Sequence, residues 1–204
     1  MDLNIGKKLI LQKNYKDAEN IFINLLKKEE NSLEINFFLG LINFELRKIK
    51  KSFFYYNQCL KIDSNSIKVL LNLANLEQSL GNIEKAREIY LEILKINKNI
   101  IRAYYGLFLL NPKYLENDFY TNLFEISKNI NISQIDKFLS NFLLSKLEKN
   151  KKNYNSEIKY LEKAHQDCFK SRNEFNLQSQ HYYNNIIYKY YNKIEFSKTS
   201  KKIY

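Results

Sequence analysis

The sequence predicts an all-α protein in which antiparallel pairs of helices stack side by side into a solenoid. Three observations lead to this fold class. The 204 residues include only four Gly and one Pro, which leaves few places for tight turns. Leu, Ile, Lys and Glu, which helices tolerate well, are abundant. Small and aromatic residues also recur with a period of 34 residues, which is typical of helical repeats.

The period is clearest in residues 1–100, where three positions of each unit keep their character. A small residue lies on the first helix, a second small residue lies on the second helix, and an aromatic residue follows one turn later. We expect the small residues to let the paired helices approach closely and the aromatic ring to fill the space beside their crossing. These packing positions are Gly6, Gly40 and Ala74, then Ala18, Ser52 and Ala86, and finally Phe22, Tyr56 and Tyr90.

Their spacing resembles the tetratricopeptide repeat, a helix–turn–helix unit of 34 residues. The resemblance implies three such repeats in residues 1–100, stacked into a right-handed superhelix. The first helix of each pair would then build the concave face of the solenoid.

The pattern breaks in residues 101–137. The next step of 34 residues lands on Phe108, which is too large for the close-contact position. Pro112 ends the helix that begins near Ile101, because proline cannot continue a helix. We expect a second helix from Tyr114 to Asn129, so that this segment is a degenerate helical insert.

The pattern returns with a shifted phase in residues 138–171, which we predict to be a degenerate repeat. Ser145 occupies the small position of its first helix, and Leu161 and Ala164 follow on the second. Glu157 stands where a small residue is expected, so the crossing of these helices should be wider or turned.

Residues 172–204 are predicted to contain a C-terminal helix. Tyr183, Ile187, Tyr190 and Ile194 form an apolar stripe at helical spacing. Such a helix would cap the exposed end of the stack, as solenoids require. The alternative is a docking helix for a following domain or a partner.

The order of these segments also resembles that in a family of longer proteins. Three repeats, an "AYYGL" helix, a helix broken by proline and the unit "FLLSKLEKNKKNYNSEIKYLEKAHQ" are similar to the N-terminal half of bacterial tetratricopeptide-repeat sulfotransferases. The resemblance implies a downstream α/β domain that binds the sulfate donor PAPS through a phosphate loop. The present sequence contains no such loop. We therefore expect no catalytic residue and no cofactor in this chain.

Composition, charge and cysteine spacing give weaker indications about function. The net charge of +11 comes from lysines spread along every segment among Glu and Asp, which favours a solvated surface over a nucleic-acid site. No run approaches the roughly 20 apolar residues that a membrane span needs. Cys59 and Cys168 are far apart and have no partner at metal-ligand spacing. With no secretory core near the start, we expect a cytoplasmic protein with reduced thiols and no metal.

The concave face supplies the candidate binding residues. Its groove could hold an extended peptide or a partner helix, with aromatic anchors and Asn75 bonding to the peptide backbone. The alternative is that Phe37, Leu41 and Leu71 only pack against neighbouring repeats. The candidate groove residues are Glu34, Phe37, Leu41, Phe44, Lys68, Leu71, Asn75, Gln78 and Tyr105.

The sequence therefore favours a non-catalytic scaffold that binds a protein or peptide through its concave face. The alternative hypothesis is the substrate-presenting half of a split or truncated PAPS-dependent sulfotransferase, whose catalytic domain would be a separate partner. Nucleic-acid binding ranks well behind both.

Overall fold

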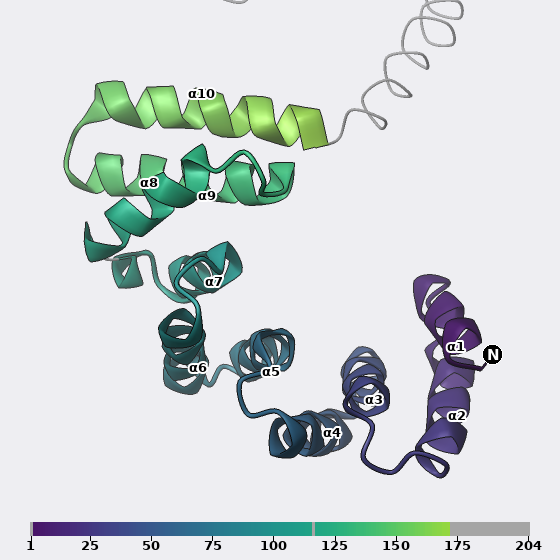
Figure 1. The fold of residues 1–204 in the computed structure, drawn as a ribbon. Coiled ribbons are helices and arrows are strands. Elements are labelled where there is room, and N and C mark those ends of the chain that lie inside the picture. Colours follow the sequence, from purple (N-terminus) through teal and green to yellow (C-terminus); the bar gives the residue numbers. More distant parts are fainter. Residues whose placement is uncertain (1, 116, 172–204) are drawn as a thin grey trace, which may run out of the picture. The chain divides into compact units, whose positions relative to one another are not determined.

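A computed structural model describes residues 2–115 and 117–171 (Figure 1). Within these residues the chain forms α-helices and two short 3-10 helices but no strand, so the predicted all-α class is confirmed. The elements are α1 (Asp2–Leu11), α2 (Tyr15–Leu26), α3 (Leu33–Glu45), α4 (Ile49–Ile62), α5 (Ile67–Ser79), α6 (Ile83–Ile96), α7 (Ile101–Leu110), η1 (Pro112–Tyr114), η2 (Asn117–Phe119), α8 (Tyr120–Lys128), α9 (Gln134–Asn150) and α10 (Tyr154–Ser171). The chain divides into two compact units between Ile126 and Ser127.

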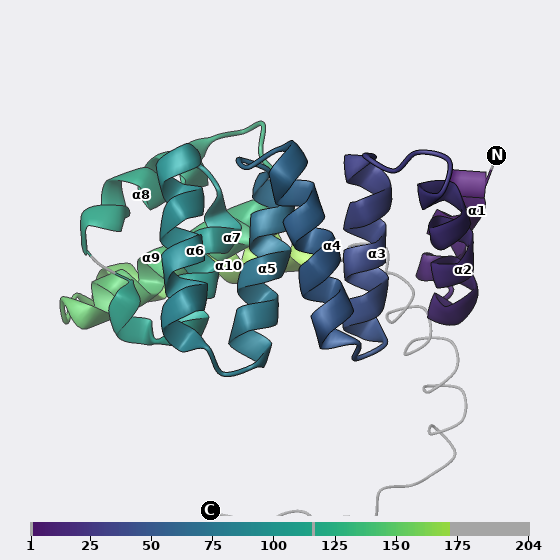
Figure 2. The ribbon, with the colours of Figure 1, turned by 90° about the horizontal axis from the view of Figure 1, so that it is seen from below.

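In the first unit the helices pack in chain order. α1 pairs with α2, α3 with α4, and α5 with α6, and each pair then contacts the first helix of the next. α3 also touches α5, and α5 touches α7. In Figure 1, α3, α5 and α7 lie along the inner side of a curved row, while α4 and α6 lie on its outer side. Figure 2 shows the same helices standing side by side. This unit is a superhelical array of helix pairs.

The packing positions explain how the helices of a pair approach each other. A Cβ atom added to Gly6 would lie 2.7 Å from the Phe22 ring, and one added to Gly40 would lie 2.4 Å from the Tyr56 ring. Ser52 donates a hydrogen bond of 2.8 Å to the Gly40 carbonyl oxygen, which satisfies a hydroxyl that is fully buried. Each glycine therefore makes room for the aromatic ring of the second helix. Ala18, Ala74 and Ala86 are fully buried as well.

Four helix pairs share one type of turn. In each, a residue with positive φ follows the first helix, and the next backbone N–H donates to a carbonyl five residues earlier, which is the hydrogen bond of a Schellman motif. The residues with positive φ are Lys13, Arg47 and Lys152, each at 59°, and Gly81 at 79°. The corresponding bonds are Asn14 to Leu9, Lys48 to Asn43, Asn82 to Glu77 and Asn153 to Glu148.

Replacing Arg47 with glycine should raise the free energy of unfolding by about 0.5–1 kcal/mol. The left-handed conformation costs a residue with a Cβ roughly 1–2 kcal/mol, and glycine avoids that cost while losing more entropy on folding. Urea denaturation followed by circular dichroism would measure the change. Gly81→Ala is the matched reverse variant. Nothing lies within 4 Å of the added Cβ, so the expected loss in free energy of unfolding comes from the left-handed backbone conformation alone. A destabilised Arg47→Gly protein would contradict this account.

The segment after α7 corrects one prediction. A helix was expected to begin at Tyr114, but the chain forms η1 and η2 first, and α8 begins only at Tyr120. Two contacts hold the chain in this path through η1 and η2. The Tyr114 hydroxyl donates to Glu84 at 2.9 Å, and the Tyr104 ring packs edge-on against Phe119 with centroids 5.0 Å apart. Leu115, in extended backbone between them, is buried.

In the second unit, α9 and α10 form an antiparallel hairpin. Ser145 and Ala164, both predicted packing residues, are buried, and the Asn141 amide donates to Asp167 at 3.0 Å across the pair. Glu157 is half-buried. The predicted C-terminal helix in residues 172–204 lies outside the described residues.

Candidate functional site

The predicted groove residues lie on three neighbouring helices of the first unit. Four lie on α3, four on α5 and one on α7, and these helices touch in that order. These three helices lie along the inner side of the curved row (Figure 1). The residues are Glu34, Phe37, Leu41 and Phe44, then Lys68, Leu71, Asn75 and Gln78, and finally Tyr105.

Phe37 does not belong to this surface. Its side chain is only 4% exposed and packs with Tyr56, the ring centroids lying 6.2 Å apart. It is therefore a core residue and cannot anchor a partner, because its position on α3 points it towards α4 and α5. Leu41, Phe44 and Leu71 are half-buried, so each both packs on the core and reaches the surface.

Phe38, which the repeat pattern did not select, lies between two lysines. The Lys68 ammonium is 3.9 Å from the Phe37 centroid and 5.4 Å from the Phe38 centroid. Lys7 is 5.4 Å from the Phe38 centroid on another helix and forms an ion pair of 2.6 Å with Glu34. Because cations are attracted to aromatic faces, Phe38 attracts Lys7, while Phe37 and Phe38 together attract Lys68.

Two amide side chains of α5 are held by a tyrosine from α6. The Tyr90 hydroxyl donates to Asn75 Oδ1 at 2.8 Å, and Gln78 Oε1 lies 3.4 Å from the same hydroxyl. Burial raises the pKa of Tyr90 to about 12, so this hydroxyl remains a donor at neutral pH. Asn75 is exposed and Gln78 is half-buried. With their oxygens turned to Tyr90, both amides can offer N–H donors to a partner.

The Tyr90 ring also lies against Gly106 of α7. A Cβ added to Gly106 would lie 2.3 Å from the ring. The period of 34 residues pointed to Phe108 as the next packing position and missed this contact. Gly6 and Phe22, or Gly40 and Tyr56, are sixteen residues apart with the glycine first, within one pair. Tyr90 and Gly106 have the same separation in the opposite order, because this glycine lies on the first helix after the pair. On either side of Gly106 in the sequence, the Tyr105 and Phe108 rings stack with their centroids 6.5 Å apart, and both side chains are half-buried.

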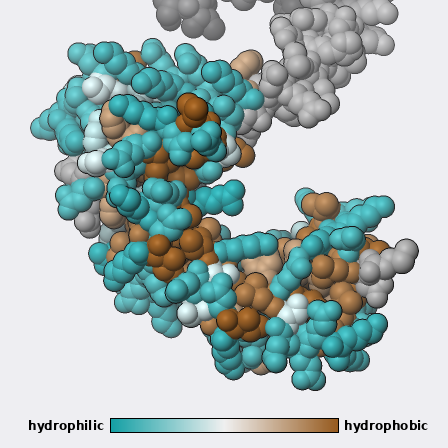
Figure 3. Space-filling view, in the orientation of Figure 1, coloured by the Kyte–Doolittle hydropathy of each residue, from teal (hydrophilic) through white to brown (hydrophobic). Residues whose placement is uncertain are grey.

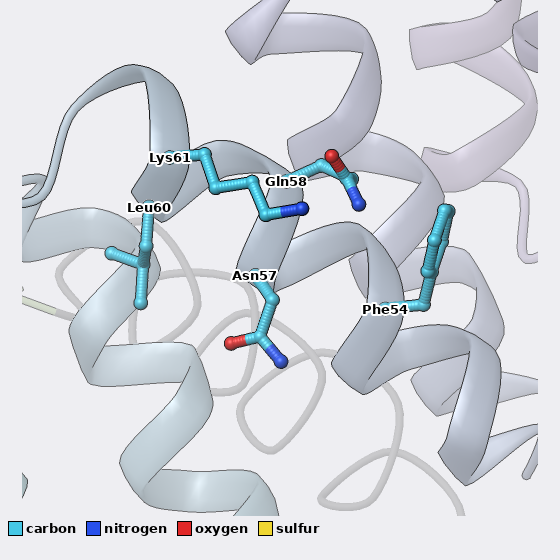
Figure 4. A pocket seen from close by; sticks show the side chains of 5 residues that line it. All are labelled: Phe54, Asn57, Gln58, Leu60 and Lys61. Atoms are coloured by element: carbon cyan, nitrogen blue, oxygen red, sulfur yellow. The ribbon is translucent and has the colours of Figure 1, made fainter.

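Hydrophilic side chains cover most of the visible face of the molecule in Figure 3, with apolar patches between them. An open depression of about 570 Å³ lies on the outer face, on α4 (Figure 4). Its lining comes from one helix and combines one aromatic ring with two amides, a leucine and a lysine. These residues are Phe54, Asn57, Gln58, Leu60 and Lys61. No acidic, hydroxyl or thiol side chain is among them.

Cys59 is a structural thiol. It is fully buried, its Sγ donates to the Leu33 carbonyl oxygen at 3.4 Å, and burial raises its pKa to about 11. The thiolate is the reactive form. We expect iodoacetamide at pH 8 to alkylate Cys59 at least a hundredfold more slowly in the folded protein than in urea, as measured by mass spectrometry of the peptide. Similar rates in both states would show that α4 opens readily.

Metal sites and membrane-spanning helices can be assessed for the part of the chain that the structure describes. No group of three or more His, Cys, Asp or Glu side chains there is placed to hold a metal ion. None of the helices described is long and apolar enough to span a lipid bilayer.

Comparison with known proteins agrees with the helix-pair architecture described above. The model of the tetratricopeptide repeat family matches residues 33–66 and 67–100, which are the α3/α4 and α5/α6 pairs with their following loops. Residues 33–100 carry two tetratricopeptide repeats.

Solved structures extend the similarity beyond these repeats. PilF of Pseudomonas aeruginosa is 16% identical, with a TM-score of 0.65, over 94% of this chain and 95% of that one. A crystal structure of MamA is 17% identical, with a TM-score of 0.59, over 81% and 95%. TTC0263, a thermophilic tetratricopeptide-repeat protein of Thermus thermophilus, is 14% identical, with a TM-score of 0.57, over 88% and 94%. At these identities the likeness establishes the repeat fold.

No curated protein sequence matches the chain. The repeat family and the structures above give no support to the resemblance to sulfotransferases.

Proposed function

We propose that this chain is a non-catalytic scaffold that binds an extended peptide segment of a protein partner through the inner face of its repeats. The observation that carries the proposal is the bond from Tyr90 to Asn75, with Gln78 beside it. Because the Tyr90 hydroxyl already holds Asn75 and lies beside Gln78, less side-chain freedom is lost when a partner binds. Fixed side-chain amides can donate to the carbonyl oxygens of an extended backbone, which any peptide provides.

Apolar side chains around these amides suit the side chains of such a peptide. Leu41, Phe44, Leu71 and Tyr105 are each half-buried, so a partner could cover their remaining surface without unfolding the repeats. Lys68 of α5 adds a positive charge beside Phe38, where the charge of Lys7 is already paired with Glu34. The repeat fold, which presents extended surfaces to protein partners, supports the same conclusion.

A matched pair of double variants tests the proposal. Peptides would first be selected against the full chain from a random peptide library, and their dissociation constants measured by fluorescence polarisation. Asn75→Ala with Gln78→Ala should weaken binding at least tenfold, because two backbone hydrogen bonds are lost. Asn57→Ala with Gln58→Ala removes the same chemistry from the outer face and should change affinity less than twofold. The reverse pattern would place binding on α4 and overturn the proposal.

We also propose that the α1/α2 and α9/α10 pairs are repeats of the same kind. The insert predicted at residues 101–137 would then end before α9, which begins at Gln134. The shared turn at Lys13, Arg47, Gly81 and Lys152 supports this organisation, as does the Gly6–Phe22 contact in the first pair. We also propose a cytoplasmic location, a reducing compartment in which free cysteines such as Cys59 and Cys168 persist.

A further inference from the structure

The helices along the inner side of the row carry a charged residue at one repeated position. Glu34 of α3, Lys68 of α5 and Arg102 of α7 follow one another at intervals of 34 residues. All three are exposed. Glu34 forms an ion pair of 2.6 Å with Lys7, whereas Lys68 and Arg102 form none within residues 2–115 and 117–171. Two exposed cations on neighbouring helices therefore lack a carboxylate partner in this part of the chain.

Repeat geometry accounts for the missing partners. Glu34 reaches Lys7, which lies 27 residues earlier on the preceding first helix. The residue 27 positions before Lys68 is a leucine, and the residue 27 positions before Arg102 is Asn75. Neither of these side chains can balance a positive charge. The same relation predicts that Arg102 of α7 lies beside Asn75 of α5, because these two helices touch.

The polar groups that these two helices present are hydrogen-bond donors. The Lys68 ammonium lies 3.9 Å from the Phe37 centroid, and a cation held over a ring keeps N–H groups for an anion. Asn75 accepts from the Tyr90 hydroxyl through Oδ1, so it presents the two N–H groups of its amide nitrogen. The guanidinium of Arg102 has N–H donors only. A carboxylate complements this set, because its two oxygens accept from a guanidinium and an amide together.

We propose, resting on the function proposed for the inner face, that the bound peptide is acidic. The carboxylate of one Asp or Glu side chain pairs with Arg102 and accepts a hydrogen bond from Asn75. Asn75 lies between Lys68 and Gln78 along α5, so the peptide continues past it in both directions and this carboxylate belongs to a side chain. Lys68 is about 10 Å from Asn75 along the helix, which about three residues of extended peptide span. Lys68 therefore pairs with a second acidic side chain about three residues away.

The first test removes the two cations from the full chain. Fluorescence polarisation would measure the dissociation constant of a peptide selected as described for the proposed function. Lys68→Gln with Arg102→Gln should weaken binding about tenfold, because two charge-assisted contacts are lost. Lys61→Gln with Lys95→Gln is the matched control, since these exposed lysines occupy equivalent positions of α4 and α6 and their loss lowers the net charge equally. Its expected effect is less than about twofold. Equal affinities of the two double variants, with folding checked by far-UV circular dichroism, would overturn the proposal.

Changes in the peptide identify the anion. When its Asp and Glu residues are replaced by Asn and Gln, the effect of Lys68→Gln with Arg102→Gln should disappear, because the charges no longer have partners. Amidation of the peptide C-terminus should change affinity less than about twofold. A larger loss on amidation would assign the cations to the C-terminal carboxylate and overturn the proposal.

The same peptides separate this proposal from the proposed function. Selected peptides without acidic residues would overturn the proposal for Lys68 and Arg102. The proposed function would still stand if Asn75→Ala with Gln78→Ala weakened the binding of those peptides. If neither pair of inner-face changes weakened binding, the proposed function would fail as well.

Discussion

Replacing Gly106 with alanine should lower the free energy of unfolding by about 1–3 kcal/mol. Alanine normally stabilises a helix relative to glycine by about 1 kcal/mol, so the expected change is opposite to that of helix propensity. The added Cβ would lie 2.3 Å from the Tyr90 ring, which is 2% exposed and has no free space to turn into. Overpacking of this kind displaces side chains and backbone together. Urea denaturation monitored by circular dichroism would measure the loss.

A double-mutant cycle shows whether the Tyr90 ring causes that loss. In a chain that already carries Tyr90→Ala, the ring is gone and Gly106→Ala should be neutral or stabilising by up to about 1 kcal/mol. An equal loss with and without the ring would mean that the Cβ collides with something else, and that the contact between α6 and α7 has been assigned to the wrong residue.

Replacing Tyr90 with alanine should be the most destabilising of these single changes, at about 3–5 kcal/mol. Removing a buried aromatic side chain from a packed core costs the transfer free energy of its atoms and leaves a cavity. This ring packs with Ala74 of α5 and Ala103 and Leu107 of α7, so the cavity would open between three helices. Thermal and urea unfolding of the variant would give the size of the effect.

Tyr90→Phe separates the ring from its hydroxyl. It keeps the packing and removes the hydroxyl with its bond to Asn75 and its longer contact to Gln78, so its expected cost is about 1 kcal/mol. If Tyr90→Phe were as unstable as Tyr90→Ala, the hydroxyl rather than the ring would dominate the stability of this region.

Much of the repeat architecture could be predicted because it is local. A period of 34 residues places each small residue and each ring at the same point of successive helix pairs, and contacts within a pair join residues close in sequence, such as Gly40 and Tyr56. The turn at Gly81 is local too, but its equivalents at Lys13, Arg47 and Lys152 carry no glycine. Composition could not reveal them, because hydrogen bonds to the end of the preceding helix hold a lysine or an arginine in the left-handed conformation.

The candidate site was predicted less completely, because exposure depends on the neighbouring helix pair. The order of residues on α3 puts both Phe37 and Phe38 near the inner face. Only the packing of α4 and α5 buries Phe37, and only Lys7 of α1 and Lys68 of α5 mark Phe38 as part of the surface. The hydrogen bond from Tyr90 to Asn75 likewise joins two helices whose relative rotation no helical pattern specifies.

The amino-acid sequence by itself determined the helix pairs, their order and the close-packed positions within each pair, since these follow from helical periodicity and side-chain size. The tertiary structure decided what the chain does where the period breaks. Contacts with Glu84 and Tyr104 hold η1 and η2 in place of the predicted start of a helix. It also decided which inner-face residues remain accessible, because burial is a property of neighbouring helices that come together only when the chain has folded.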